Sequence, residues 1–214
     1  MLFAQIAQGA RGAFALISLV SYGLQYRLLQ QLQLGQSIAD EVIDATDARV
    51  QLLTNIQLVV AILAFVALVL WFYRAYQNVH RLPDTQPEYS PRMAALSWFI
   101  PFVNLWVPYK IMLEIGHYIG GFTAPRTSII SSWWDYLMVG WWALNIGVII
   151  VSRITLAALI SSAESVSIEE LLHSTRLFMA SQVITALCAF ATVAILTAIA
   201  AHESTPLIAQ DKTL

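Results

Sequence analysis

One long uncharged stretch of the sequence is the feature that most constrains how this chain can fold. No Asp, Glu, Lys or Arg lies between Arg49 and Arg74, and the segment IQLVVAILAFVALVLWFY within it is apolar on every face of a helix. A bilayer core about 30 Å thick is crossed by about 20 helical residues, because each residue adds about 1.5 Å. The stretch therefore predicts a membrane-spanning helix over residues 54–75.

Three further apolar stretches predict spans of the same kind. One of them includes Arg27, whose long side chain must reach an interface, and another opens with the aromatic pair Trp133 and Trp134, which favours the headgroup boundary. Hydrophobic residues make up 58% of the chain and charged residues 11%, against about 25% charged in a soluble domain. The sequence predicts an all-α integral membrane bundle, a single domain over residues 1–214, with its other spans at 12–32, 133–154 and 177–201.

Charge and cysteine content narrow the classes of protein to which the chain can belong. Arg11 followed by GAFALISLVSYG has the order of a secretory signal, but no small-x-small cleavage site follows, so a retained helix is expected. The formal net charge is −2 and no basic run appears, which argues against nucleic-acid binding. Cys188 is the one cysteine of the sequence, so an internal disulfide is excluded.

A fifth apolar stretch, WFIPFVNLWVPYK, is interrupted by prolines. Ser90 and Pro91 form a good helix start, and the short apolar helix that follows should end near Pro101. A second helix should start at Pro108. Each half has about ten residues and is about 15 Å long, half a bilayer. We predict a re-entrant or interfacial helical hairpin over residues 91–119, with an ordinary span kinked by two prolines as the alternative.

The two prolines also leave backbone groups to be satisfied. In an unbroken helix Pro101 would strand the carbonyl of Ser97, and Pro108 would strand that of Asn104. An unsatisfied backbone group in hydrocarbon costs several kcal/mol. We therefore expect the turn to pack against other protein or to face water, with the Asn104 amide as a local partner.

The distribution of Lys and Arg predicts the orientation, because cytoplasmic segments carry the excess. If the broken segment does not cross, the inside holds seven cations, Arg11, Arg74, Arg81, Arg92, Lys110, Arg126 and Lys212, and the outside four, Arg27, Arg49, Arg153 and Arg176. If it crosses, the counts become six and five. The non-crossing layout with both termini in the cytoplasm is favoured.

Two motifs in the middle of the chain carry a resemblance. The segments WFYRAYQN and SPRMAALSWFIPFVNLWVPYKIMLEI resemble a bacterial multi-pass membrane family catalogued as domain of unknown function 4328. Its pattern W-x-x-R-A-x-x-N, then P-x-x-N-L-x-x-P-Y-x-x-M-x-E, is matched by Trp71, Arg74, Ala75 and Asn78, then by Pro101, Asn104, Leu105, Pro108, Tyr109, Met112 and Glu114. Gly116 stands where the family usually has a tryptophan. The resemblance implies a bacterial inner-membrane protein and brings no substrate, reaction or cofactor.

Reactive constellations are missing from the sequence. No ionisable residue lies near a span centre, and no pair of mid-span histidines suits a buried haem. No G-x-S-x-G, H-E-x-x-H or Gly-rich phosphate loop occurs. Asn145 is the strongly polar residue expected well inside a span, as an interhelical hydrogen bonder. We expect no metal, no cofactor and no enzymatic activity.

What remains is a polar cluster predicted near the cytoplasmic boundary. We expect Arg74 to pair with Glu114 or Asp135 and so to latch the broken segment to the bundle, or else to form a ligand or partner site. Arg74 and Asn78 are neighbours on one helix face, because they are four residues apart. The full candidate cluster is Trp71, Arg74, Asn78, Pro101, Asn104, Pro108, Tyr109, Lys110, Glu114 and Asp135.

These observations predict a broad role for the protein but identify no biochemical activity. The first interpretation is a non-enzymatic accessory, scaffold or assembly protein, whose partners are membrane lipids and other membrane subunits or a second copy. One alternative is a small transporter whose broken segment lines a cavity. Another is a sensor that binds a ligand at the cluster of Arg74 and Asn104.

Overall fold

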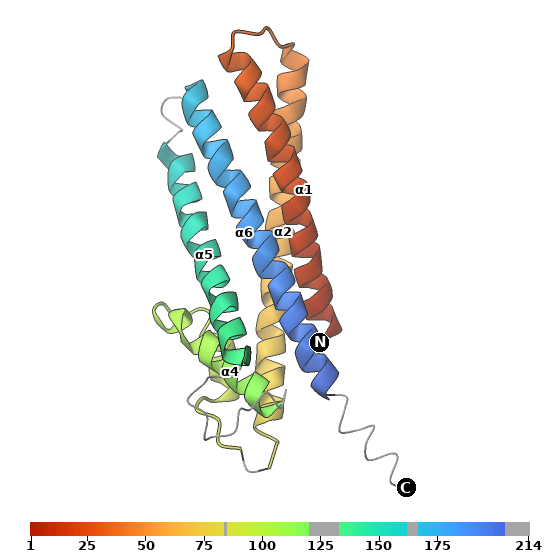
Figure 1. Ribbon diagram of the computed structural model, residues 1–214, viewed down its shortest axis with the longest axis vertical. Helices are drawn as coiled ribbons and strands as arrows, with labels where there is room; N and C mark the ends of the chain where they lie inside the picture. The colour runs from red at the N-terminus through yellow and green to blue at the C-terminus, as the bar shows by residue number, and fades with distance from the viewer. Residues whose placement is uncertain (84, 120–132, 162–166, 204–214) are drawn as a thin grey trace. The chain divides into compact units, whose positions relative to one another are not determined.

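The computed structural model describes residues 1–83, 85–119, 133–161 and 167–203, without the side chains of residues 133, 156, 158–161, 202 and 203. Arg126 and Lys212, counted above for the orientation, lie outside the described residues. All regular structure in the described part is helical, which confirms the predicted fold class (Figure 1). The elements are α1 Leu2–Gln33, α2 Asp40–Val79, α3 Pro91–Leu96, the 3-10 helix η1 Val103–Leu105, α4 Val107–Tyr118, α5 Trp133–Ser161 and α6 Ile168–Glu203.

Four of these helices, α1, α2, α5 and α6, are long and apolar enough to cross a membrane. They extend beyond the predicted spans, because the acidic segments next to those spans are largely helical. Asp40 and Glu41 lie in the first turn of α2, and Glu169 and Glu170 in the first turn of α6. Carboxylates are favourable at helix N-termini, where the helix dipole is positive. A helix can therefore continue past the apolar stretch that predicts it.

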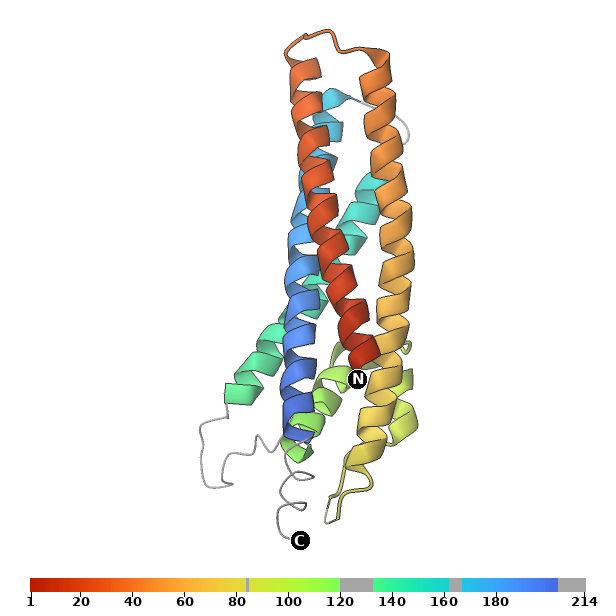
Figure 2. The same ribbon diagram turned by 90° about the vertical axis from the view of Figure 1, so that its right-hand side faces the viewer.

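Local sequence fixes two of the helix ends. After α1, Gly35 has φ 75°, and the N–H groups of Gly35 and Gln36 donate to the carbonyls of Leu32 and Gln31. This is a Schellman motif, which suits glycine because a left-handed φ carries no Cβ penalty there. The short connection that follows joins α1 to α2 (Figure 2).

At the start of α6, Ser167 and Glu170 form a reciprocal capping box. The Glu170 N–H donates to the Ser167 hydroxyl at 3.2 Å, and the Ser167 N–H donates to the Glu170 carboxylate at 3.3 Å. Two N–H groups that have no partner within the helix are satisfied in this way.

The chain divides into two compact units. Unit 1 comprises residues 1–8, 63–143 and 191–214, and unit 2 comprises residues 9–62 and 144–190. Unit 1 holds the broken segment together with parts of all four long helices. Its core consists of large apolar side chains that are fully buried, among them Phe72, Ile111, Trp134, Met138 and Trp141.

Unit 2 is joined by polar contacts between its helices. The Ser18 hydroxyl donates to the Gln57 side chain at 3.0 Å, and Gln57 donates to Gln182 at 2.6 Å, which links α1, α2 and α6. Asn145 was expected to be the strongly polar residue well inside a span. The structure adds Gln57 and Gln182, which the sequence analysis overlooked because they lie near the ends of the predicted spans.

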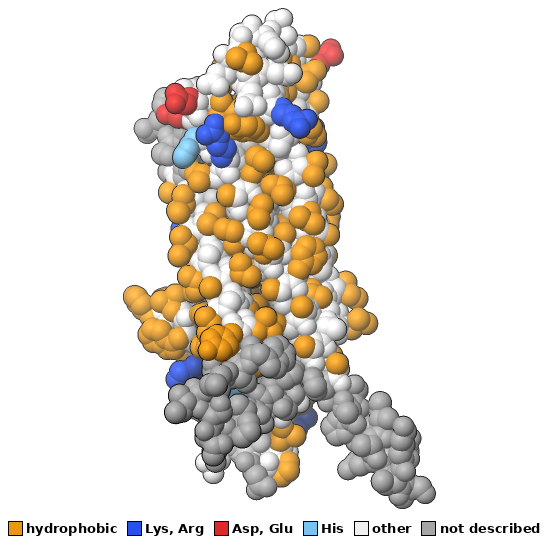
Figure 3. Space-filling model, viewed as in Figure 1, with side chains coloured by type: hydrophobic (Ala, Val, Ile, Leu, Met, Phe, Trp, Pro, Cys, Tyr) orange, Lys and Arg blue, Asp and Glu red, His pale blue; other side chains and the backbone are white. Residues whose placement is uncertain are grey.

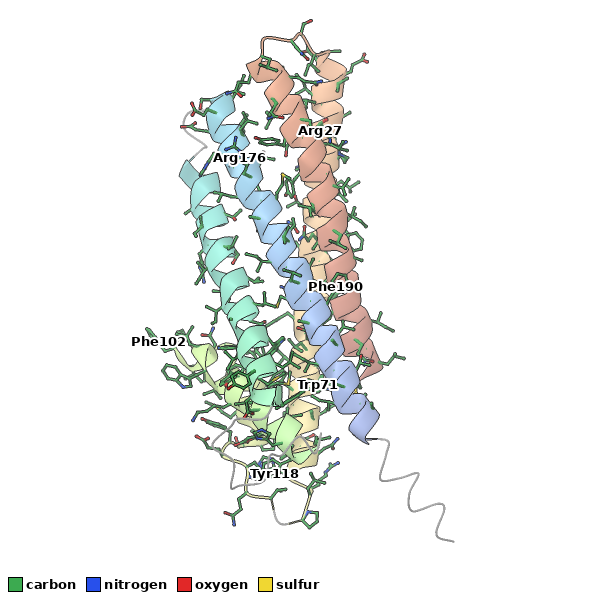
Figure 4. The ribbon with its side chains drawn as sticks, viewed as in Figure 1. Arg27, Trp71, Phe102, Tyr118, Arg176 and Phe190 are labelled. Atoms are coloured by element: carbon green, nitrogen blue, oxygen red, sulfur yellow. The ribbon has the colours of Figure 1, made fainter. Side chains whose placement is uncertain are left out.

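Close approach of α1 and α6 within unit 2 depends on a glycine. A Cβ placed on Gly12 would lie 2.9 Å from the Phe190 ring, closer than side chains pack. Figure 4 labels Phe190 on α6. The absence of a side chain at Gly12 therefore lets the ring rest on the backbone of α1.

The predicted break lies in unit 1. The Ser90 hydroxyl accepts from the Met93 N–H and caps α3, as predicted, and Pro108 lies in the first turn of α4. Helix α3 ends at Leu96, earlier than expected. With six and twelve residues, α3 and α4 are each too short to cross a bilayer, which needs about 20.

Candidate functional site

Several peptide groups of the break are hydrogen-bonded within its own backbone or to one indole. The Asn104 N–H donates to the Ile100 carbonyl at 3.0 Å, and the Val103 N–H donates to the Pro101 carbonyl at 2.8 Å. From α5, Trp142 Nε1 donates to the Leu105 carbonyl at 2.7 Å. One carbonyl of the turn is therefore bonded to a neighbouring helix.

The Asn104 side chain was expected to be the local partner of the turn. Its amide makes no hydrogen bond with a described residue, and the backbone of the 3-10 helix takes that part. The 3-10 turn supplies backbone donors instead, since the N–H groups of Leu105 and Trp106 donate to the carbonyls of Phe102 and Val103.

Aromatic packing holds the base of the break against α2 and α5. The Trp98 ring lies edge to face with Phe72, at 5.2 Å between centroids, and with Phe65 and Trp142 at 6.0 and 6.1 Å. Edge-to-face pairs of this kind contribute about 0.5–1.5 kcal/mol beyond the area that they bury.

A hydrogen-bonded group, here called the latch, joins α2 to α4 and consists of Tyr76, Glu88, Tyr89, Lys110 and Glu114. The Tyr76 hydroxyl donates to the Glu114 carboxylate and accepts from the Tyr89 N–H at 3.1 Å. The other oxygen of Glu114 accepts from the Glu88 N–H at 3.2 Å. Because Tyr76 is fully buried, the group fixes α4 and residues 88–89 against the bundle.

The exposed edge of the latch is an ion pair. Lys110 Nζ lies 3.1 Å from Glu88 Oε1, and the Tyr89 hydroxyl donates to the same oxygen at 2.9 Å. The Tyr89 hydroxyl and the Lys110 ammonium lower the pKa of the Glu88 carboxyl below its ordinary 4.5. The bond to Glu88 raises the pKa of Lys110 above its ordinary 10.5. Both side chains are solvated, so the pair contributes little to stability.

The predicted pairing of Arg74 with Glu114 or Asp135 is wrong. Glu114 is bonded to Tyr76 and to the Glu88 backbone, and the Asp135 carboxylate accepts from His117 Nε2 at 3.0 Å. Residues two apart on a helix point to different sides, so a helix that turns Tyr76 toward α4 must turn Arg74 away.

Arg74 instead lines a groove of about 450 Å³ in unit 1. All four residues that matched the first motif, Trp71, Arg74, Ala75 and Asn78, line this groove. The opposite wall comes from the start of α1, where Met1, Phe3 and Ala4 lie. The Arg74 and Asn78 side chains are exposed, so a guanidinium and an amide are available to a ligand in the groove.

The predicted cluster is therefore divided. Trp71, Arg74 and Asn78 line the groove, Lys110 and Glu114 belong to the latch, and Asp135 pairs with His117 between α5 and α4. The remaining members belong to the break or follow it. Pro101 is exposed, Asn104 and Tyr109 are half-buried and Pro108 is buried.

Gly116 makes room for an aromatic ring from another helix. A Cβ on Gly116 would lie 2.1 Å from the Trp134 ring, and Trp134 is fully buried. The resemblance placed a tryptophan at this position in the family. In this chain Trp134 of α5 fills the space beside α4.

Sequence reasoning missed four members of these contacts, Tyr76, Glu88, Tyr89 and His117. Tyr76 lies inside the quoted motif WFYRAYQN, but the motif pattern leaves its position open. Glu88 and Tyr89 belong to the connection before α3, where no periodicity indicates a partner. Glu88 lies two residues before Ser90, the predicted helix cap, and this proximity is the one signal in the sequence that points to the connection.

Comparison with known proteins identifies a family. The family described as Domain of unknown function (DUF4328) matches residues 35–201. No curated protein and no solved structure matches the chain. The match includes α2 and continues through nearly all of α6, so it covers the broken segment, the latch and most of the groove.

Proposed function

The chain belongs to the family of Domain of unknown function (DUF4328), and we propose that it is a non-enzymatic accessory or scaffold protein that presents its broken segment to another membrane protein. One observation carries the proposal. The base of the segment is anchored by the latch and by Trp98, whereas its tip is apolar and exposed. The tip is defined as Leu96, Phe99, Ile100, Phe102, Leu105 and Trp106.

The tip has the chemistry of a protein interface. Phe99, Phe102 and Trp106 are 63%, 76% and 54% exposed. Figure 4 shows Phe102 at the outer end of the segment, and Figure 3 shows hydrophobic side chains protruding there. Large aromatic side chains are enriched at the energetic centres of interfaces. A helical membrane protein with four apolar helices gains little from one more lipid anchor, which favours a protein partner.

The backbone of the tip supports the same role. Phe102 has φ 63°, in the left-handed region that a bulky residue rarely adopts. Such a conformation costs about 1–3 kcal/mol and persists when the surroundings hold it. The hydrogen bonds of η1 and the Trp142 indole provide that restraint, so the aromatic side chains are held in place before any partner arrives.

The carboxylates near the segment support a structural role over a catalytic one. Glu114 and Glu88 are committed to the latch, and Asp135 to His117. A general acid or base must be able to reach a reacting group. Carboxylates that hold two helices and a connection together are poorly placed for that task.

A site-specific photo-crosslinker at position 102 tests the proposal. In native membranes we expect Phe102→p-benzoylphenylalanine to form a discrete protein adduct. The same replacement at Val139, an apolar residue of unit 1 that is 54% exposed, is the matched control and should give none. Adducts of equal yield at both positions, or lipid adducts alone at position 102, would contradict a protein partner at the tip.

The inner membrane of a bacterium, with both termini in the cytoplasm, is part of the same proposal. It is supported by the excess of Lys and Arg around the broken segment. In a Cys188→Ser background, single cysteines at Asp44 and Gln86 should react with impermeant reagents from opposite sides. Position 123, outside the described residues, should react from the same side as Gln86. Labelling of positions 86 and 123 from opposite sides would mean that the segment crosses.

The groove lined by Arg74 and Asn78 favours a second candidate function, ligand sensing. Asn104 does not line this groove, so the ligand site would consist of the first motif alone. A thermal-shift screen of small carboxylates and phosphates should find a stabilising anion that Arg74→Gln no longer responds to. If the variant and the wild type respond equally to every anion, the groove has no such role. The alternative of a small transporter, whose broken segment would line a cavity, stays a prediction made from the sequence.

A further inference from the structure

Unit 2 contains a groove of its own, separate from the groove of unit 1. Its volume is about 490 Å³, and it lies along α1 with one contribution from α6. The described side chains that line it include no carboxylate. They are Val20, Gly23, Leu24, Tyr26, Arg27, Gln30 and Met179.

The groove is apolar at one end and polar at the other. Val20 and Leu24 lie at the apolar end, while Arg27 and Gln30 lie nearer the end of α1. Arg27 lies seven positions after Val20, which corresponds to about 10 Å along a helix. The polarity of the groove therefore changes along its length as the polarity of a lipid does, from acyl chain to headgroup.

Space for a chain comes from a glycine. A Cβ on Gly23 would meet nothing within 4 Å, so the middle of the groove is open. The backbone of α1 itself forms the floor there. An acyl chain can therefore lie against the helix between Val20, Leu24 and Met179.

A second arginine is fixed at the rim of the groove. Arg176 of α6 donates to the Tyr26 hydroxyl through Nε at 3.1 Å and through Nη2 at 2.9 Å, and its guanidinium lies 5.4 Å from the centre of the Tyr26 ring. A guanidinium has five N–H donors, so several stay available. Figure 4 labels Arg27 and Arg176, and Figure 3 shows cationic side chains on that part of unit 2.

We infer that this groove binds one anionic phospholipid, with the phosphate at Arg27 and Arg176 and one acyl chain over Gly23. Charge complementarity carries the choice of ligand, because Arg27 in the wall and Arg176 on the adjoining Tyr26 face no carboxylate among the described residues that line the groove. Arginine suits phosphate oxygens through its fork of donors. The inference is independent of the broken segment and of the role proposed for it.

Native mass spectrometry of the purified protein with defined lipids tests the site. Protein released from mild detergent with added phosphatidylglycerol should retain one lipid, and retain it better than phosphatidylcholine. Arg27→Gln combined with Arg176→Gln should weaken phosphatidylglycerol binding by about tenfold, the effect of losing about 1.4 kcal/mol. Gly23→Leu should reduce retention of both lipids, because the side chain fills the acyl path.

Two matched controls separate the site from general effects. Arg153→Gln removes an exposed arginine of unit 2 outside the groove, and Gly9→Leu adds a side chain at another open glycine of α1. Both should retain phosphatidylglycerol as the wild type does. Size-exclusion profiles establish that each variant is folded. If the double variant is not folded, the single Arg27→Gln variant, whose side chain is exposed, replaces it in the test.

Three results would overturn the inference. One is equal lipid retention by the groove variants and the controls. Another is binding of inorganic phosphate by delipidated protein, dependent on Arg27, without retention of any lipid, since the site would then take a free anion. The third is formation of a dimer that Gly23→Leu abolishes, because the groove would then hold a second copy of the chain.

Discussion

Units 1 and 2 are built from parts of the same four long helices, yet they are held together differently. In unit 1, buried rings and aliphatic side chains such as Phe72, Trp134 and Trp141 fill the core. In unit 2, helices are connected by hydrogen bonds such as those of Gln57 with Ser18 and Gln182. Lipid tails are as apolar as leucine, so burial alone drives little helix association in a bilayer. Shape complementarity and interhelical hydrogen bonds are the two remaining sources of stability. Unit 1 combines its aromatic core with the latch, whereas the hydrogen bonds of Gln57 link three helices of unit 2.

The largest expected effect tests the packing of unit 1. Trp134→Ala removes a fully buried indole beside Gly116 and should destabilise the protein by about 3–5 kcal/mol. Thermal unfolding in mild detergent, followed by circular dichroism and size-exclusion chromatography, measures the loss. An unchanged midpoint would mean that unit 1 does not depend on its aromatic core.

A smaller effect is expected when the same contact is overfilled. Gly116→Ala brings a methyl group to 2.1 Å from the Trp134 ring and should cost about 1–3 kcal/mol. Gly140→Ala is the matched control, because a Cβ there meets nothing within 4 Å. If the two alanines behave alike, the close approach of α4 and α5 is not what constrains position 116.

The latch should respond to loss of a single hydroxyl. Tyr76→Phe removes the donor to Glu114 and the acceptor of the Tyr89 N–H, which should cost about 1–3 kcal/mol. The loss should appear as faster proteolysis around residues 88–90 in nanodiscs. Tyr73→Phe, a neighbouring half-buried tyrosine outside the latch, should leave the cleavage rate as it is in the wild type.

Unit 2 should respond in a different way. Gln57→Leu breaks two interhelical hydrogen bonds and should cost about 1 kcal/mol, the scale measured for such bonds in membranes. Adding Gln182→Leu should restore part of that loss, since Gln182 is then not left unpaired and the Ser18 hydroxyl can donate to a carbonyl one turn back in its own helix. Further destabilisation in the double variant would show that unit 2, too, depends on shape.

The smallest expected effect is the pH dependence of the ion pair between Glu88 and Lys110. The pKa of Glu88 is lowered, so its contribution is present above its ordinary pKa of 4.5 and is lost as the pH falls through the depressed value. The pKa of Lys110 is raised, so its contribution is present below 10.5 and is lost as the pH rises through the higher value. Proteolysis around residues 88–90 should be slowest between these limits, and Glu88→Gln should abolish the acid limb.

The positions of the helices follow from the sequence because each is specified locally. The uncharged stretch before Arg74, Ser90 before Pro91, and Pro108 at the start of α4 predicted a long helix, a break and a restart, all found in the structure. The candidate site was predicted less well. Lys110 and Glu114 were rightly grouped, but Arg74 was assigned the role that Tyr76 fills, because the sequence does not say which face of α2 meets α4.

By itself the sequence determined that this chain is an all-α protein with four helices able to cross a membrane and a proline-broken segment between them. Charge-free length and proline positions act on the nearest residues, so they can be read without a fold. Only the tertiary structure decided which side chain satisfies Glu114, which ring occupies the space at Gly116, and where arginines flank an open groove. Those outcomes depend on the rotation of one helix against another, and contacts between distant residues set that rotation.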